Sequence, residues 1–246
     1  MKNQVKNILV IRNDRFGEFL LILPALRALK ETYPQARITL AVDSYIADLA
    51  GAIEGVSGVI IWENRKHSFR EIISFGRKIR EIGFDAAIVF NPTKDSHLAC
   101  FLAKIPMRIG YSRKWGFLLT HRIYDRKNLA LKHEIEYNLD LVALAGAFTN
   151  DKSPKLKIAD TNFPELLKDS PLIAIHPWTS DKVKQWPLVR FKELIMRLSG
   201  FNIVIVGGKE EFLDGNYIGL EFANDASQGG VDTVQPLRHG HCSGHA

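Results

Sequence analysis

The chain has 246 residues, a net charge of +6 and a sequence pI of about 9.3, with 46% hydrophobic and 24% charged residues. This composition is typical of a globular protein with one large or two small domains, and no apolar run approaches the ~20 residues of a bilayer-spanning helix. The positive charge favours anionic partners such as phosphates, nucleotides or an acidic membrane surface. No basic-aromatic module for nucleic acid is present, so we expect no nucleic-acid partner.

The stretch 7–30 predicts a strand, a polar loop and a helix. Ile8–Ile11 is an apolar run between polar residues, which is typical of a strand buried on both faces of a parallel sheet. Beyond the loop, apolar residues recur at helical spacing, and Pro24 among them indicates a kink or a late helix start. The loop therefore lies at the carboxyl end of the strand, where open α/β sheets place their chemistry.

The loop carries two carboxylates and two guanidiniums close together, with one glycine; they are Asp14, Glu18, Arg12, Arg15 and Gly17. We expect Glu18 in the first turn of the helix, where the macrodipole favours a charged carboxylate, and it is a candidate general base. The alternative stays open: Glu18 only starts the helix, and the arginines are solvated.

Strands and helices continue to alternate as far as residue 146. Further strands are predicted at 38–42, 59–62, 86–90 and 108–111, and helices at 45–52, 68–82, 97–104 and 132–146. On the helix 68–82 the face expected in the core comprises Ile72, Phe75, Ile79 and Ile82. The alternation predicts an α/β domain with a parallel, doubly wound sheet over residues 1–150.

Residues 151–170 lack periodicity and are expected to form a linker, with one short strand at 156–158. A second α/β domain is expected over 171–246, with a strand at 172–175, a polar loop at 176–185, a helix at 187–198 and a strand at 203–206. From about residue 212 the pattern becomes irregular. Two explanations stay open: the second lobe is incomplete, or the tail is not native coding sequence.

Several stretches, in order, resemble glycosyltransferase family 9, the ADP-heptose:lipopolysaccharide heptosyltransferases. They are VIRNDRFGEFLLILPALRALKETYP, SHLACFLAKIPMRIGY, HEIEYNLDLVALAG, and IHPWTSDKVKQWPLVRFKELIMRL followed by IVIVGG. The resemblance implies a GT-B-like fold of two Rossmann-like domains with parallel sheets, the second incomplete here. It also implies an inverting, metal-independent transfer of a sugar from a nucleotide diphosphate donor, with no cofactor and no metal ligands. ADP-heptose is the family's default donor.

The resemblance also assigns roles to residues. The family's base is an aspartate directly after the loop glycine, and here that position is Glu18, with Asp14 as the fallback. Thr179, Ser180 and Lys184 match the loop on the phosphate side of the donor. The alternative for Lys184 is an ordinary surface lysine. His176 ends a strand inside the same motif, and we place it near the donor site.

One family motif, Asp-Ser/Thr-Gly-x-x-His, is missing after Gly208, although it contacts the donor nucleotide in the family. The alternative function is therefore an inactive fragment or binding module that lacks the donor site. The family's acceptors are lipid-linked saccharides at the cytoplasmic face of the inner membrane. We expect a cytoplasmic chain without a signal peptide, with peripheral contact to anionic lipid through basic residues such as Arg113 and Lys114.

Two rival functions are weaker. A nicotinamide-dependent oxidoreductase expects G-x-G-x-x-G after the first strand, whereas this loop has only Gly17. A zinc site in the tail would use His239, His241, Cys242 and His245, but these residues match no usual ligand spacing. Only two cysteines, Cys100 and Cys242, occur in the whole chain, which gives no disulfide framework and fits a cytoplasmic setting.

Overall fold

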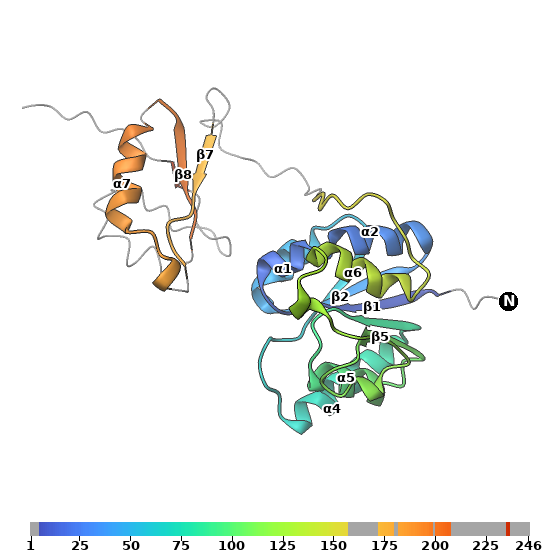
Figure 1. Cartoon of the computed structure of the whole chain (residues 1–246). Coiled ribbons are helices and arrows are strands. Elements are labelled where there is room, and N and C mark those ends of the chain that lie inside the picture. Colours follow the sequence, from blue (N-terminus) through green and yellow to red (C-terminus); the bar gives the residue numbers. More distant parts are fainter. Residues whose placement is uncertain (1–4, 157–171, 180–181, 199, 208–234, 237–246) are drawn as a thin grey trace, which may run out of the picture. The chain divides into compact units, whose positions relative to one another are not determined.

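The computed structural model describes residues 5–156, 172–179, 182–198, 200–207 and 235–236. The chain divides into two compact units, Met1–Asp160 and Thr161–Ala246, referred to below as the N-terminal and the C-terminal unit (Figure 1).

A six-stranded sheet forms the centre of the N-terminal unit. Its strands are β1 (Asn7–Ile11), β2 (Arg37–Val42), β3 (Val56–Ile61), β4 (Ala86–Val89), β5 (Met107–Tyr111) and β6 (His121–Ile123). They are all parallel, in the order β3-β2-β1-β4-β5-β6. The chain builds outward from β1 to one edge and then returns to build the other, so the order reverses between β1 and β4. The predicted parallel, doubly wound sheet is confirmed; the edge strand β6 is not among the expected elements.

Helices cover both faces of this sheet, and Figure 1 shows α1, α2 and α6 on one face and α4 and α5 on the other. The helices are α1 (Phe16–Leu20), α2 (Leu23–Thr32), α3 (Ala47–Gly51), α4 (Phe69–Ile82), α5 (Lys94–Leu102) and α6 (Glu134–Ala143). Side chains of β1 alternate between two buried clusters: Ile8 and Val10 pack with α2 and α6, whereas Leu9 and Ile11 pack with α4 and α5. The apolar run of β1 is thus buried on both faces, as its composition predicts.

The helical stretch after the polar loop that follows β1 is broken in two, because α1 ends at Leu20 and α2 starts at Leu23. Pro24 lies in the first turn of α2, where its missing N–H removes no helical hydrogen bond. The late helix start indicated by Pro24 is confirmed. The break leaves α1 as a separate five-residue helix that carries Glu18 in its first turn.

Helix α4 is closed at both ends by its sequence. Ser68 and Glu71 form a reciprocal capping box, and Gly83 ends the helix with a φ of 74°. Ile72, Phe75 and Ile79 are buried as predicted, but Ile82 is 44% exposed. The expectation for Ile82 is wrong because this residue lies in the last turn, beyond the edge of the buried face.

The C-terminal unit contains two parallel strands, β7 (Leu172–Ile175) and β8 (Asn202–Ile205), and helix α7 (Leu188–Arg197). The short strand β9 (Gln235–Pro236) pairs antiparallel with β8. The buried cluster of the C-terminal unit comprises Ile175, Ile195, Ile203 and Ile205. The predicted strand, helix and strand are confirmed to within one or two residues. Residues 157–158 of the strand expected at 156–158, and the irregular tail apart from β9, lie outside the described residues.

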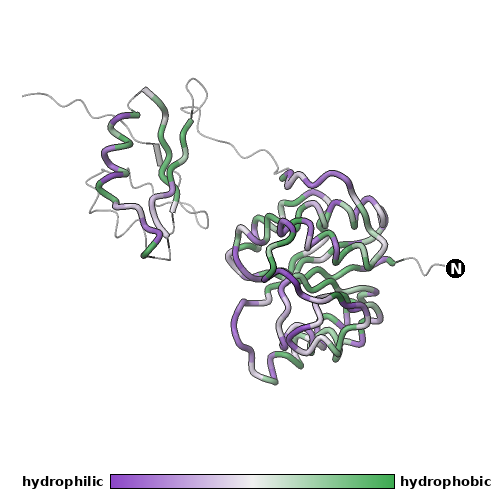
Figure 2. Tube along the Cα trace, in the orientation of Figure 1, coloured by the Kyte–Doolittle hydropathy of each residue, from purple (hydrophilic) through white to green (hydrophobic). Residues whose placement is uncertain are grey.

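Hydropathy follows this architecture. Figure 2 shows hydrophobic residues concentrated along the central strands of the N-terminal unit. Within the ranges that the structure describes, no helix combines the length and the apolar character needed to cross a bilayer.

Candidate active site

The loop after β1 is fixed to three other strands of the sheet. The backbone N–H of Arg12 donates to Ala41 O at 3.1 Å, at the end of β2. The buried Asn13 side chain donates to the backbone oxygens of Trp62 and Glu63 after β3, at 2.9 and 3.1 Å. It also accepts a hydrogen bond from Asn91 after β4, at 3.2 Å. The loop therefore sits rigidly at the carboxyl edge, beside the point where the strand order reverses.

Arg12 is the centre of the site. Only 2% of this residue is exposed, and its guanidinium contacts three carboxylates. Nε lies 2.7 Å from Asp14 Oδ1, Nη2 lies 2.5 Å from Glu18 Oε2, and Nη1 lies 3.5 Å from Glu134 Oε1. The alternative that the loop arginines are solvated is therefore wrong for Arg12, because a buried charge needs partners. Arg15 is exposed, as that alternative expects.

Two residues of the site were not among those expected from the sequence. Glu134 opens helix α6, and Lys127 precedes it in a single 3₁₀ turn, Lys127–Leu129. The Lys127 ammonium lies 2.5 Å from Glu134 Oε1, the oxygen that Arg12 also approaches, and 4.8 Å from the centre of the Tyr111 ring. Glu134 lies within HEIEYN, part of a stretch that resembles the family, so the sequence could have indicated it as a site residue. No comparable motif contains Lys127.

The two candidate bases differ in environment. Burial raises the pKa of the Asp14 carboxyl above its usual value, and the neighbouring Arg12 guanidinium opposes this shift. The Asp14 side chain is 22% exposed, whereas the Glu18 side chain is 37% exposed. Gly17, next to Glu18, is exposed, and a methyl group at its Cβ position would meet no atom within 4 Å. Glu18 is thus the more accessible of the two carboxylates.

A cavity of about 310 Å³ opens beside this cluster, and Lys127 belongs to both. We call it the Lys127 pocket; its lining residues are Ser112, Arg113, Tyr124, Asp125, Lys127 and Asn128. Within it, Arg113 Nε and Asp125 Oδ2 form an ion pair at 2.9 Å. Two of the lining residues, Arg113 and Lys127, have cationic side chains.

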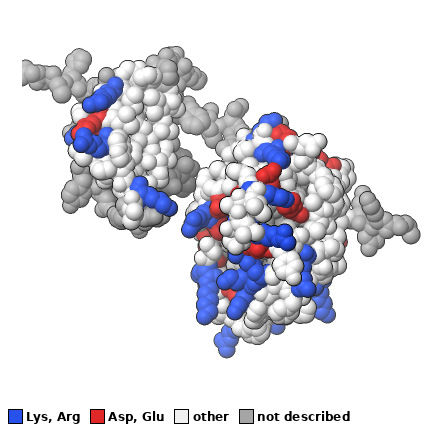
Figure 3. Space-filling model, in the orientation of Figure 1, with Lys and Arg blue, Asp and Glu red and all other residues white. Residues whose placement is uncertain are grey.

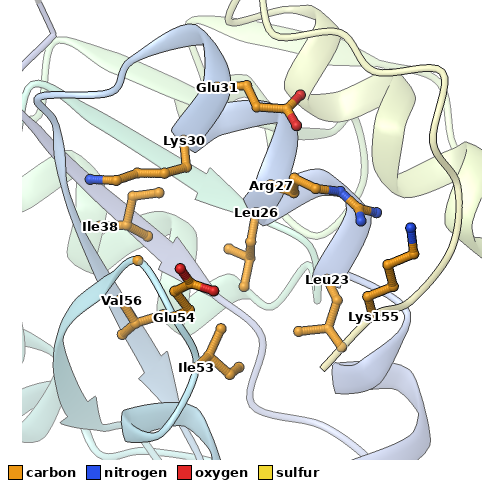
Figure 4. A pocket seen from close by; sticks show the side chains of 11 residues that line it. Leu23, Leu26, Arg27, Lys30, Glu31, Ile38, Ile53, Glu54, Val56 and Lys155 are labelled. Atoms are coloured by element: carbon orange, nitrogen blue, oxygen red, sulfur yellow. The ribbon is translucent and has the colours of Figure 1, made fainter. Parts of the chain in front are cut away.

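A second cavity, of about 330 Å³, lies against α2 at the opposite edge of the sheet, near the starts of β2 and β3. Figure 4 shows apolar side chains from α2 and the strands at its base and charged side chains around them. Arg27 at its rim is held by Asp151, through an ion pair of 3.1 Å, and by the backbone oxygen of Ser153. None of the site residues expected from the sequence lines this cavity.

In the C-terminal unit, the loop between β7 and α7 is held by Gln185. Its Oε1 accepts from the backbone N–H of Thr179 at 3.1 Å, and its Nε2 donates to the backbone oxygens of Trp186, at 2.9 Å, and Pro177. His176 and Lys184, both exposed, lie on this loop. Gln185 was not expected from the sequence, where it reads as an ordinary polar loop residue.

The structure thus groups the expected residues in two sets. Arg12, Asp14 and Glu18 meet in the N-terminal unit, whereas His176, Thr179 and Lys184 share one loop of the C-terminal unit. Ser180 lies outside the described residues, as do His239, His241, Cys242 and His245 of the tail. Among the residues that are described, no group of three or more His, Cys, Asp or Glu side chains is arranged to hold a metal ion.

Comparison with known proteins assigns this arrangement to a family. The model of glycosyltransferase family 9 (heptosyltransferase) matches residues 72–224, which is more than half of the chain. A putative glycosyltransferase of Haemophilus influenzae is 34% identical over 141 residues, covering 56% of this chain and 40% of the relative. Lipopolysaccharide heptosyltransferase 2 of Escherichia coli is 25% identical over 237 residues, covering 86% of this chain and 66% of the relative.

Among solved structures, E. coli ADP-heptose LPS heptosyltransferase II matches with a TM-score of 0.71 and 23% identity, over 86% of this chain and 67% of that chain. This likeness supports the fold. The chain spans two thirds or less of the length of the two curated relatives named above. The match of the family model to most of the chain, together with the α/β fold, shows that the chain belongs to glycosyltransferase family 9.

Proposed function

We propose that this chain transfers a heptose-like sugar from a nucleotide diphosphate donor, such as ADP-heptose, to a saccharide acceptor of the lipopolysaccharide type. The observation that carries the proposal is the Arg12 cluster, which holds Glu18 and Asp14 at the carboxyl edge of the sheet in a family 9 chain. The relatives support the substrates, because one is a lipopolysaccharide heptosyltransferase and a matching structure is that of an ADP-heptose enzyme.

In the proposed reaction Glu18 acts as the general base. Its carboxylate takes the proton of an acceptor hydroxyl while the hydroxyl oxygen attacks the anomeric carbon from the face opposite the nucleotide. A new carbon–oxygen bond forms, the bond to the diphosphate oxygen breaks, and the diphosphate leaves with the electron pair. The configuration at the anomeric carbon is inverted. Arg12, 2.5 Å from Glu18, holds this carboxylate at the carboxyl edge of the sheet.

The departing diphosphate gathers negative charge, which cationic and hydrogen-bonding groups stabilise. We assign this role to the loop after β7, where Thr179, Ser180 and Lys184 offer two hydroxyls and one ammonium, and the same stretch of sequence carries His176. In this proposal the protein's own side chains neutralise the leaving group, and the reaction needs no metal ion. Gln185 supports the loop by binding the backbone of Thr179.

The acceptor class also leads us to propose peripheral contact with anionic lipid at the inner face of the inner membrane. Figure 3 shows many Lys and Arg side chains on the presented face of the N-terminal unit. Lys114 is exposed next to Trp115, which is 42% exposed, and an aromatic ring beside a cation suits a membrane surface.

Replacing both Lys114 and Trp115, by Lys114→Gln and Trp115→Ser, is expected to abolish sedimentation with phosphatidylglycerol vesicles. Unchanged sedimentation would contradict this contact; Arg77→Gln with Lys78→Gln on α4 is the matched control.

Nucleotide binding tests the proposed function. The whole chain is titrated with ADP, UDP, GDP and CMP, and its melting temperature is followed. A nucleotide at 100 times its dissociation constant adds about 2.7 kcal/mol to the free energy of unfolding. We expect selective stabilisation by ADP, weakened by Lys184→Met and unaffected by Lys192→Met on α7. A chain that melts cooperatively but responds to none of the four nucleotides would contradict the proposal.

A further inference from the structure

Lys127 joins the Lys127 pocket to the Arg12 cluster. Lys127 lines the pocket, and its ammonium forms the 2.5 Å ion pair with Glu134. The same oxygen of Glu134 lies 3.5 Å from Arg12 Nη1, and Arg12 Nη2 holds Glu18 at 2.5 Å. A continuous chain of ion pairs therefore runs from the pocket to the proposed base.

Glu134 makes two contacts of unequal length, and the shorter one decides which cation neutralises its charge. Glu134 is paired closely with Lys127 and only loosely with Arg12, whose shorter contacts go to Asp14 and Glu18. Attraction between charges falls with distance, so Lys127 at present satisfies most of the charge of Glu134. A Glu134 that lost Lys127 would draw the Arg12 guanidinium toward itself, because a half-buried carboxylate needs a cationic partner.

The pocket fits a group that would compete for Lys127. Its lining residues carry two cationic groups, on Lys127 and Arg113, two hydroxyls, on Ser112 and Tyr124, and the amide of Asn128. Cations surrounded by neutral hydrogen-bond donors recognise a phosphate or carboxylate attached to a hydroxyl-rich molecule. Asp125 is already paired with Arg113, which limits its repulsion of such an anion.

We propose that Lys127 is a positioning residue that couples the pocket to Glu18. An anionic group of a saccharide enters the pocket and competes with Glu134 for the Lys127 ammonium. Glu134 then pairs more closely with the Arg12 guanidinium, and the ion pair between Arg12 and Glu18 weakens. Glu18 becomes free to accept a proton only when the anionic saccharide is in place. The inference rests on the proposed function for the role of Glu18 as the base.

The test is a nuclear magnetic resonance titration of the whole isotope-labelled chain with glucose 6-phosphate, inorganic phosphate and glucose at constant ionic strength. We expect glucose 6-phosphate to shift the backbone signals of the lining residues and of Glu134, and the side-chain signals of Arg12 and Glu18. Glucose should shift none of them. Inorganic phosphate should bind more weakly than glucose 6-phosphate. Equal affinity would mean that the pocket binds free anions, and it would overturn the claim that the pocket recognises an anionic saccharide.

Variants separate coupling from general charge effects. Lys127→Met should weaken glucose 6-phosphate binding by about tenfold or more, while Lys127→Arg should retain most of it. Lys132→Met is the matched control, because Lys132 is paired with Asp140 at 2.6 Å and does not line the pocket. It should change the affinity by less than about twofold.

Glu134→Gln gives the sharpest result. It removes the competitor for Lys127, so binding of glucose 6-phosphate should become tighter, by about fivefold, and the Arg12 and Glu18 signals should no longer respond. A residue with a merely structural role would not produce tighter binding. Unchanged or weaker binding in Glu134→Gln, or equal loss in the Lys127→Met and Lys132→Met variants, would overturn the coupling. Absence of sugar transfer by a chain that shows the coupling would count against the proposed function alone.

Discussion

Arg12 and Glu18 are joined by an ion pair of 2.5 Å between guanidinium Nη2 and carboxylate Oε2. The two residues come from the end of β1 and the first turn of α1, and the guanidinium is almost fully buried while the carboxylate reaches solvent. A buried cation thereby holds an accessible carboxylate at the edge of the sheet where this fold class places its chemistry.

The first prediction concerns Arg12→Met. Removing the guanidinium leaves Asp14, Glu18 and Glu134 without their shared partner, and breaking a buried ion network in this way is destabilising. Because the carboxylates are partly exposed, we expect a loss of about 2–3 kcal/mol in the free energy of unfolding. Urea unfolding followed by circular dichroism measures it.

Arg15→Met is the matched control for this prediction, because Arg15 lies in the same loop and is exposed. Its free energy of unfolding should change by less than about 0.5 kcal/mol. Equal effects of the two substitutions would mean that the loss comes from net charge and not from the ion network.

Much of the fold could be predicted from the sequence because its signals are local. The apolar run of β1, the helical spacing of apolar residues in α4 and the alternation of strands and helices each depend on residues close together in the chain. Strand β6 lacks such a signal, since it has three residues, His121–Ile123, and pairs with β5 only at the sheet edge. The exposure of Ile82 depends on where α4 leaves the core, which helical spacing alone does not fix.

The candidate site could be predicted only in part, for a related reason. Asp14 and Glu18 lie in one short loop with Arg12, so the sequence points to all three. The burial of Arg12 depends on Glu134, 122 residues further along, and on Lys127, and only the folded sheet brings these residues together. Gln185 likewise matters through backbone contacts that a sequence pattern does not display.

The second prediction concerns Gln185→Ala. The substitution removes the acceptor for the Thr179 N–H and the donor for two backbone oxygens, and each lost hydrogen bond costs about 1 kcal/mol. We expect weaker ADP binding in a calorimetric titration, because the loop that carries Thr179 and Lys184 is no longer fixed. Val183→Ala is the control, since the Val183 side chain belongs to the same loop and Val183 is 94% exposed. ADP affinity that Gln185→Ala leaves intact would show that the loop needs no such support.

The third prediction is a pH dependence. The hydrogen bond from Arg65, together with those from Ser68, lowers the pKa of Glu71 from 4.5 to about 2. A carboxyl group with a lowered folded-state pKa stabilises the protein above its unfolded-state value, and that stabilisation is lost as the pH falls through the folded-state value. The difference in melting temperature between the wild type and Glu71→Gln should therefore be full near pH 7 and shrink between about pH 4.5 and pH 2.

Glu81→Gln provides the comparison for this pH dependence, because Glu81 lies on the same helix outside the capping box. It should change the melting temperature less than Glu71→Gln at neutral pH. A Glu71→Gln effect that stays constant from neutral pH down to about pH 2 would mean that it does not come from the charge of Glu71 and its hydrogen bonds with Arg65 and Ser68.

The central claim is that Glu18 is the base of a sugar transfer, and one assay tests it most directly. ADP release from ADP-heptose is measured with a lipopolysaccharide-type acceptor for the wild type, Glu18→Gln and Asp14→Asn. Glu18→Gln should lower kcat by about 100- to 10,000-fold and leave the Kd for ADP unchanged, whereas Asp14→Asn should keep more activity. Full turnover by Glu18→Gln would contradict the claim, and loss of turnover in Asp14→Asn alone would move the base to Asp14.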